Sequence, residues 1–303
     1  MPADNSCISI SGPWQHRFVQ ANGAQFHIAH AGTYSDTRPL VLLVHGFPQY
    51  WWAWREQIAP LAAAGFEVAA IDKRGFGGSD KTPNSADALL LTDDLISLVH
   101  SLGYDRAFLV GLGRGGALAW SAVSKAPDLF AGLVTVSSPH PRTLHRLGMH
   151  LTLRTWRHAI SSFLTPLAEK KLQDSRHIAQ LLQEWSAPGN NGAAGQADLY
   201  TQALRLPGVA RAALAQLRWT LLSQHSARGR RYLRESANPV KVPILAVRGA
   251  LDPLLPPRAW NKDAEFARGS YELLTIAQAG HFVPEEQPAA FTDALRIFLQ
   301  THC

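Results

Sequence analysis

The glycine-rich stretch GLGRGG at 111–116 follows an apolar run and leads into a helical pattern, and it fits two kinds of chemistry. As G-x-G-x-x-G, with Gly111, Gly113 and Gly116, it matches a turn that binds the pyrophosphate of a dinucleotide. As G-x-Nu-x-G it matches a strand–turn–helix elbow that presents a nucleophile at residue 113, with small neighbours so that the helix packs closely. In this second frame position 113 holds a glycine, which has no group that can attack a substrate.

Two features disfavour dinucleotide binding. The fingerprint normally follows the first strand of its unit, whereas several strand patterns precede residue 111. It also requires a carboxylate at the end of the next strand, roughly 20 residues on, to bind the ribose. The next apolar run ends in Val136, Ser137 and Ser138 and has no acidic residue there. No cofactor and no metal ion are therefore expected at this turn.

Two titratable residues follow later strand patterns. Asp252 comes shortly after the apolar run at 244–248, and His281 comes shortly after the run at 271–277. An acid that orients a histidine makes that histidine an effective general base. The chain order of residue 113, Asp252 and His281 matches the order nucleophile, acid, histidine of one type of hydrolytic triad.

Strand and helix patterns alternate along most of the chain, which predicts a parallel α/β sheet with helices on both faces. The predicted strands are 26–30, 40–45, 66–72, 107–111, 133–137, 244–248 and 271–277. The predicted helices are 53–64, 86–102, 114–126, 256–266 and 285–300. From about 139 to 236 no strand pattern appears, and we expect amphipathic helices with a polar loop at 186–196.

The segments around these residues resemble α/β-hydrolases of the epoxide hydrolase and haloalkane dehalogenase branch. The resemblance is carried by HGFPQ at 45–49, by DKRGFGGSD at 72–80, and by the segments that contain the elbow, Asp252 and His281. It covers 12–138 and 237–300 and is weaker between them. It implies an α/β-hydrolase fold with a mostly parallel eight-stranded sheet flanked by helices. It also implies that 1–138 and 237–303 form the core and 139–236 form an inserted helical cap.

The resemblance implies roles for individual residues. Position 113 is that of the nucleophile, His281 matches the general base, and Asp252 matches the acid that orients it. The backbone N–H of Phe47 is placed in the oxyanion hole. Arg114 at the elbow is expected either to stabilise an anion there or to point outward from the helix start. The expected pocket walls are Trp51, Trp52, His140 and Leu217. The expected loop-ordering residues are Asp72 and Arg74.

Four positions depart from the family's pattern. Gly113 replaces the nucleophile, Leu112 stands where a histidine is common, and Arg114 stands where an aromatic or small residue is often found. Leu217 precedes Arg218-Trp219 where a cap tyrosine protonates the epoxide oxygen. Epoxide opening in this family needs a carboxylate at the elbow, so the resemblance predicts neither a competent epoxide hydrolase nor a dehalogenase. Several departures together favour natural divergence over one engineered substitution.

Two hypotheses for activity remain open. The first is a catalytically dead binding or regulatory protein that keeps a pocket for a small apolar ligand. The second is an enzyme in which His281, held by Asp252, acts as a general base on water or on an acidic proton without a covalent intermediate. Ser137 and Ser138 are less favoured as replacement nucleophiles, because SSPHP resembles the family's hinge into the cap.

The amino-acid composition limits the expected cellular location and the expected binding partners. The chain has 303 residues and a net charge of +6, but 140–235 alone holds 14 Lys and Arg against 5 Asp and Glu. This excess favours a solvated helical face, with weak contact to a membrane surface or an anionic partner as the alternative. No signal-peptide pattern or apolar stretch of about 18 residues occurs, and Cys7 and Cys303 show no disulfide or metal spacing. We expect a cytoplasmic protein that binds a small molecule and no nucleic acid.

Overall fold

An eight-stranded sheet lies at the centre of the computed structural model, which describes residues 5–35, 37–147, 167–222 and 226–303. The strand order is β1-β2-β4-β3-β5-β6-β7-β8. The β1–β2 and β2–β4 pairs are antiparallel, and the other neighbouring pairs are parallel. The strands are β1 (Gln15–Ala21), β2 (Ala24–Ala31), β3 (Leu40–Val44), β4 (Val68–Ile71), β5 (Ala107–Leu112), β6 (Phe130–Val136), β7 (Ile244–Gly249) and β8 (Tyr271–Ile276). The expected α/β-hydrolase fold is confirmed.

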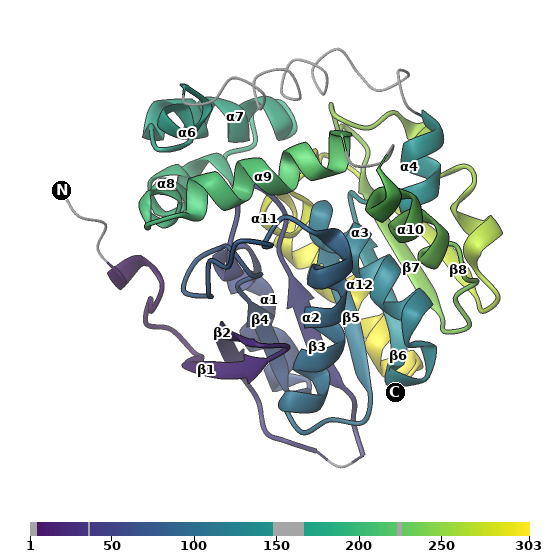
Figure 1. Ribbon diagram of the computed structural model, residues 1–303. Helices are drawn as coiled ribbons and strands as arrows, with labels where there is room; N and C mark the ends of the chain where they lie inside the picture. Colours follow the sequence, from purple (N-terminus) through teal and green to yellow (C-terminus); the bar gives the residue numbers. More distant parts are fainter. Residues whose placement is uncertain (1–4, 36, 148–166, 223–225) are drawn as a thin grey trace.

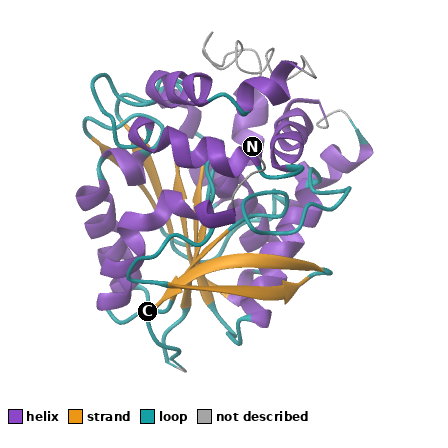
Figure 2. Ribbon diagram, turned by 90° about the vertical axis from the view of Figure 1, so that its left-hand side faces the viewer, coloured by secondary structure: helices purple, strands orange, loops and turns teal. Residues whose placement is uncertain are grey.

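Helices cover both faces of the sheet (Figure 2). One apolar core includes Ile58 of α1 (Arg55–Ala63) and Phe291 of α12 (Pro288–Thr301). The other includes Leu95 of α2 (Ala88–Ser101) and Trp120 of α3 (Arg114–Lys125). Every residue of the central strands β3, β5 and β6 is buried, which explains why continuous apolar runs predicted them.

Two elements differ from the prediction. Strand β1 was not predicted, because it lies at the sheet edge and exposes part of its surface, including Phe18 at 53%. The predicted helix at 256–266 is instead two short 3₁₀ turns, η7 (Pro257–Trp260) and η8 (Asp263–Phe266). Pro256 and Pro257 carry no backbone N–H, which limits helical hydrogen bonding where this segment begins.

The chain between β6 and β7 is helical, and its described residues form no strand. Its helices are α4 (Pro141–Leu147), α6 (Leu167–Leu172), α7 (Ser175–Trp185), α8 (Ala197–Arg205), α9 (Val209–Leu222) and α10 (Ala227–Glu235). The short elements elsewhere and within it are η1 (Asn5–Cys7), η2 (Trp51–Trp54), η3 (Pro127–Leu129), η5 (Ala194–Gln196) and α11 (Val283–Glu286). Helices α6 to α9 lie above the sheet in Figure 1, as a helical insertion would. The part of the predicted insertion at 148–166 lies outside the described residues.

Helix α9 packs directly on the loop that follows β4. Gln216 Nε2 donates to the carbonyl oxygens of Arg74, at 3.0 Å, and Ser85, at 2.8 Å. A Cβ atom added at Gly75 would lie 2.8 Å from the Cβ atom of Ala212, so the helix and the loop are in close contact. Helix α9 therefore covers the carboxyl end of the sheet at this point.

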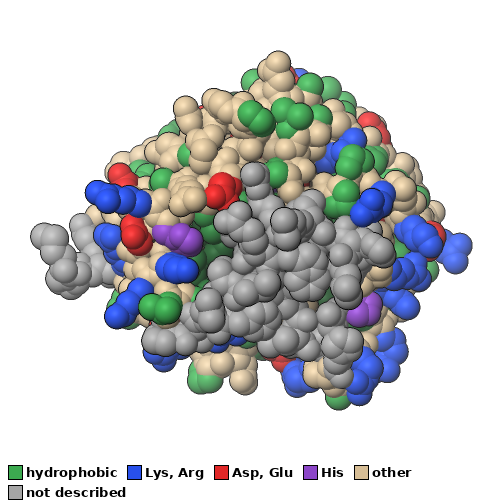
Figure 3. All heavy atoms as spheres, turned by 90° about the horizontal axis from the view of Figure 1, so that it is seen from above, with side chains coloured by type: hydrophobic (Ala, Val, Ile, Leu, Met, Phe, Trp, Pro, Cys, Tyr) green, Lys and Arg blue, Asp and Glu red, His purple; other side chains and the backbone are tan. Residues whose placement is uncertain are grey.

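The surface charge and the hydropathy of the helices concern the predicted contact with an anionic partner or a membrane surface. In the view from above, Lys and Arg side chains lie on both flanks of the visible face and outnumber the acidic ones (Figure 3). None of the helices formed by the described residues combines the length and apolarity needed to cross a membrane. Within the same residues, no group of three or more His, Cys, Asp and Glu side chains could hold a metal ion.

Candidate functional site

The glycine-rich turn joins β5 to α3 by close backbone contact. An added Cβ would lie 2.5 Å from the carbonyl carbon of Gly115 if placed at Gly111, and 2.3 Å from the carbonyl oxygen of Val44 if placed at Gly115. At Gly116 it would lie 2.5 Å from the Cβ atom of Ser138. These distances are too short for any side chain, so the glycines are required by packing.

Gly113 differs from the other glycines of this turn. It has φ 51° and ψ −114°, a conformation that L side chains rarely adopt. An added Cβ would meet only the ring of His281, with Nε2 at 3.4 Å, which is an ordinary contact distance. A side chain at residue 113 would therefore have room and would point toward His281.

His281 is held by contacts on several sides. Its Nδ1 lies 3.0 Å from Asp252 Oδ2, and its backbone N–H donates to the carbonyl oxygen of Trp185 at 2.9 Å. Asp252 is fixed in turn, because its Oδ1 accepts a hydrogen bond from the backbone N–H of Leu254 at 2.8 Å. With Nδ1 donating to the carboxylate, Nε2 is the ring nitrogen available as a base on the side of Gly113.

The loop after β3 borders the elbow. An added Cβ at Gly46 would lie 3.2 Å from the carbonyl oxygen of Leu112, so the loop and the elbow are in contact. The ring of Phe47 packs on Trp185, which also contacts His281, with centroid distances of 6.1 Å and 5.7 Å. Arg114 is the first residue of α3, so its backbone N–H has no acceptor within the helix. Phe47 and Arg114 are thus brought to the same region as His281.

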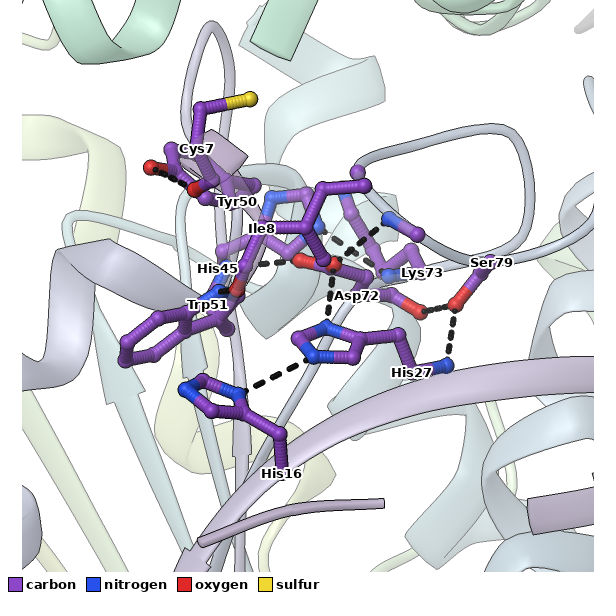
Figure 4. Close-up of polar contacts among 12 residues, drawn as sticks. Cys7, Ile8, His16, His27, His45, Tyr50, Trp51, Asp72, Lys73 and Ser79 are labelled. Atoms are coloured by element: carbon purple, nitrogen blue, oxygen red, sulfur yellow. Dashed lines mark hydrogen bonds and ion pairs between the residues drawn. The ribbon is translucent and has the colours of Figure 1, made fainter. Parts of the chain in front are cut away.

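The loop after β4 is ordered by Asp72 (Figure 4). Its carboxylate accepts hydrogen bonds from the backbone N–H groups of Trp51 and Gly78, both at 2.9 Å, and lies 2.8 Å from His27 Nδ1. His27 Nε2 is 3.1 Å from Nδ1 of His16. Asp72 is completely buried, which raises its pKa, but hydrogen bonding and the electrostatic effect of the neighbouring histidines outweigh burial and lower the pKa. Its position agrees with the predicted loop-ordering role.

Arg74 also holds this loop in place. Its Nε donates to Asp94 Oδ2 at 2.8 Å and its Nη2 donates to Asp94 Oδ1 at 2.6 Å. Such a two-point contact fixes a guanidinium firmly, and the same Nη2 reaches the carbonyl oxygen of Asn22 at 2.9 Å. The arrangement agrees with the predicted structural role of Arg74.

The sequence analysis missed Lys73, which immediately follows Asp72. Lys73 is 2% exposed, and its Nζ is buried with no hydrogen-bond partner among the residues that the structure describes. Nζ lies 4.9 Å from the ring centroid of Phe76. Burial, reinforced by the positive charge of Arg114, lowers the pKa of Lys73 well below its usual value. The sequence shows a lysine at the carboxyl end of a predicted strand, but Lys73 was interpreted only as part of the loop segment 72–80.

The predicted pocket walls fall into two groups. Trp52 and Leu217 are partly buried, and Trp52 Nε1 donates to Gln196 Oε1 at 2.9 Å. Trp51 and His140, which were also expected at a pocket wall, have no exposed surface. Trp51 Nε1 donates to the carbonyl oxygen of Ile8 at 2.8 Å, and His140 stacks on Phe266 with centroids 3.6 Å apart. Both rings pack in the protein interior.

The segment 139–236 contains two tyrosines, and both are engaged in structural contacts. Tyr200 is completely buried, and its hydroxyl donates to Glu285 Oε1 at 2.6 Å. The same carboxylate oxygen accepts from Arg55 Nη1 at 2.7 Å. Tyr232 donates to the carbonyl oxygen of Ala117 at 3.1 Å. The network around Glu285 was not predicted, since its members are far apart in the sequence.

Ser137 and Ser138 lie at the carboxyl end of β6. Ser137 has φ 47°, and its Oγ is buried without a hydrogen-bond partner among the described residues. Ser138 packs against Gly116, where an added Cβ would lie 2.7 Å from its Oγ. Neither hydroxyl is hydrogen-bonded to His281 in the described part of the chain. This placement gives no support to either serine as a replacement nucleophile.

The fold and the elbow with its neighbouring histidine and carboxylate define an α/β-hydrolase. A family model described as alpha/beta hydrolase fold matches residues 39–288, and the chain belongs to this family. It is 29% identical to the AB hydrolase superfamily protein YfhM of Bacillus subtilis, over 94% of this chain and 97% of that protein. It is 28% identical to epoxide hydrolase 3 of Xenopus tropicalis, over 97% of this chain and 80% of that protein.

Solved structures give the same picture. An epoxide hydrolase from an endophytic Streptomyces superposes with a TM-score of 0.74 at 26% identity, covering 96% of each chain. The structure of Bacillus megaterium epoxide hydrolase in complex with an inhibitor superposes with a TM-score of 0.78. At 21% identity, covering 94% of this chain and 100% of that one, this second likeness concerns the fold alone. The chain is therefore an α/β-hydrolase-fold protein with epoxide hydrolase-like relatives.

Proposed function

We propose that this protein binds a small, largely apolar organic molecule between the elbow and the helices above it, and that it does not hydrolyse epoxides or haloalkanes through a covalent ester. The observation that carries the proposal is Gly113. It occupies the turn from which a side chain would point at His281 Nε2, 3.4 Å from an added Cβ, and it supplies no nucleophile.

The expected loss of activity is large. Removing the nucleophile of a catalytic triad typically lowers turnover by about 10⁶-fold and leaves only binding and oxyanion stabilisation. The hydroxyls of Tyr200 and Tyr232 are committed to Glu285 and to the backbone of Ala117, so neither supports protonation of an epoxide oxygen. A cytoplasmic location is part of the same proposal and rests on the sequence alone.

Turnover of an epoxide is tested first. Styrene oxide is incubated with the wild-type protein, and formation of the diol is followed by gas chromatography. We expect no diol above the uncatalysed background. A wild-type rate above background that falls in the His281→Ala variant would contradict the proposal.

The binding arm uses phenylacetamide as a neutral aromatic probe, measured by isothermal titration calorimetry. Leu217→Trp should weaken its binding, because Leu217 lies on α9 and is only partly buried. Leu273→Trp is the matched control, since Leu273 is 40% exposed on β8. Equal binding by both variants would contradict a binding site beneath α9.

A second candidate function is supported by the intact contact between His281 and Asp252. A histidine oriented by a carboxylate can act as a general base on water without a covalent intermediate. Hydrolysis of 4-nitrophenyl acetate by the wild-type protein should then exceed that of His281→Ala, with Asp252→Asn in between. Equal rates for the wild-type protein and His281→Ala would exclude this second candidate for ester substrates.

A further inference from the structure

The end of helix α7 lies directly against the loop that carries His281. A Cβ atom added at Gly280 would lie 2.5 Å from the backbone nitrogen of Ala187 and 2.8 Å from the carbonyl oxygen of Trp185. The backbone N–H of His281 donates to that same carbonyl oxygen at 2.9 Å. These distances leave no space for a side chain at Gly280, so the two segments pack backbone against backbone.

The carboxylate of Glu286 joins these two segments. Its Oε2 atom accepts hydrogen bonds from the backbone N–H groups of Gly280 and Ala187, both at 2.7 Å. Its Oε1 atom accepts a hydrogen bond from the backbone N–H of Phe282 at 2.8 Å. Two of the three donors therefore flank His281 in the sequence, and the third lies in the chain that follows α7.

The short helix α11 brings Glu286 to this position. The backbone N–H groups of Glu285 and Glu286 both donate to the carbonyl oxygen of Phe282 at 2.9 Å, so the chain turns immediately after His281. The side chain of Glu286 can then reach back to the N–H of the residue before the helix, as acidic side chains near a helix start commonly do. Asn190 Nδ2 donates to the carbonyl oxygen of Glu286 at 2.9 Å, which adds a further contact with the chain after α7.

Burial makes the hydrogen bonds of Glu286 costly to break. Glu286 is 5% exposed and Ala187 is 2% exposed, so water has little access to either partner. Burial raises the pKa of Glu286, but its three N–H donors and His281 oppose this shift because they stabilise the ionised form. If the end of α7 moved away from the His281 loop, a buried N–H would lose its acceptor and the carboxylate would lose a donor. The two segments are therefore expected to move together.

We propose that Glu286 is a positioning residue that holds His281 and the end of helix α7 together, so that the imidazole keeps its place facing Gly113 only while α7 keeps its own. A displacement of α7, whether by a ligand or by a mutation, should therefore also displace His281. This inference goes beyond the proposed function, because it concerns how the site is held and does not depend on which molecule the site binds.

The direct test replaces Glu286 with glutamine in the full chain. Glutamine has nearly the same shape, but its amide has one acceptor oxygen instead of two, and its NH₂ group cannot accept a hydrogen bond from a backbone N–H. Amide hydrogen exchange of the folded protein is measured by mass spectrometry with residue-level fragmentation. Exchange at Ala187, Gly280 and Phe282 should accelerate by about 10- to 100-fold, which corresponds to the loss of one hydrogen bond to a charged group.

A matched control and a second readout separate positioning from a general loss of stability. Glu272→Gln, at an exposed position of β8, should leave the three amides at their wild-type exchange rates. Diethyl pyrocarbonate acylates neutral imidazoles, and peptide mass spectrometry gives the rate at each histidine. Glu286→Gln should accelerate the reaction of His281, while His140, which has no exposed surface and reports global opening, keeps its wild-type rate. An unchanged rate at His281, or equal acceleration at both histidines, would overturn the proposal.

The link to α7 is tested with Leu182→Ala, which removes a completely buried side chain of that helix. This variant should accelerate amide exchange at Gly280 and Phe282 as well as at Ala187. The acceleration at Gly280 and Phe282 should be smaller in the Glu286→Gln background, because mutations within one network are not additive. Equal acceleration in both backgrounds, or an acceleration confined to Ala187, would overturn the proposal. The second of these results decides the question even if Glu286→Gln does not fold.

Discussion

The Nε2 atom of His281 faces Gly113, while the Nδ1 atom of the same ring lies 3.0 Å from a carboxylate oxygen of Asp252. The imidazole and the carboxylate are thus in contact, and residue 113 on the other side of the ring has no side chain. This relationship makes the consequences of changing residue 113 testable.

Gly113→Ala should lower the free energy of unfolding by about 1–3 kcal/mol. The cause is backbone strain at φ 51°, because an added Cβ has only an ordinary contact with His281. Urea denaturation measures the effect, with Gly195→Ala as the control. Gly195 has open space around it and no positive φ, so its substitution should be neutral or stabilising. Equal effects of the two substitutions would argue against strain at residue 113.

Gly113→Asp should not by itself give an efficient epoxide hydrolase, because the hydroxyls of Tyr200 and Tyr232 are engaged elsewhere. Adding Leu217→Tyr should raise diol formation from styrene oxide above that of either single variant. Combining both changes with His281→Ala should leave the ester intermediate uncleaved, which intact-protein mass spectrometry detects. Full activity of Gly113→Asp alone would mean that no cap tyrosine is needed.

Lys73→Met should raise the free energy of unfolding at pH 7 by about 1–3 kcal/mol, because it removes an unpaired buried cation. The pKa of Lys73 is lowered in the folded protein, so the unfolded chain binds more protons and stability rises with pH up to the unfolded pKa of about 10.4. The wild-type protein should therefore approach the stability of Lys73→Met as the pH is raised from 7 to 9.5. A constant difference across this interval would contradict the lowered pKa.

Asp263→Asn tests a titration away from the elbow. Burial raises the pKa of Asp263 to about 7, although its Oδ2 accepts a hydrogen bond from the backbone N–H of His140 at 3.0 Å. The folded protein then binds the proton more tightly than the unfolded chain, so stability falls as the pH rises from about 4 to 7, by at most about 1.4 kcal/mol per unit.

The Asp263→Asn variant should lack this contribution, so thermal unfolding at pH 4 and pH 7 should show a smaller fall in stability than in the wild-type protein. Asp128→Asn, at an exposed position, is the control and should keep the wild-type dependence. A slope unchanged by Asp263→Asn would contradict the raised pKa.

The central strands were predictable because burial on both faces demands continuous apolar runs, as in β3 and β5. The elbow was predictable because close contacts at Gly111, Gly115 and Gly116 leave no space for a side chain. Strand β1 escaped prediction because it lies at the sheet edge and is partly exposed, so its residues form no continuous apolar run.

Individual side-chain roles were harder to predict. Trp51 was expected at a pocket wall, but its indole N–H is bound to the backbone of Ile8, a contact between distant segments. Lys73 was missed because its importance depends on the burial of Nζ and on the neighbouring Arg114, which belongs to another strand–helix unit. Contacts between residues that are far apart in the chain produce no local pattern in the sequence.

Glycine at the elbow has an evolutionary consequence. A side chain introduced at residue 113 would meet an unfavourable backbone conformation at once. Because the hydroxyls of Tyr200 and Tyr232 are engaged elsewhere, a new activity would need at least one further change. The intermediate sequence would be less stable without being more active, so glycine at this position is easier to keep than to replace.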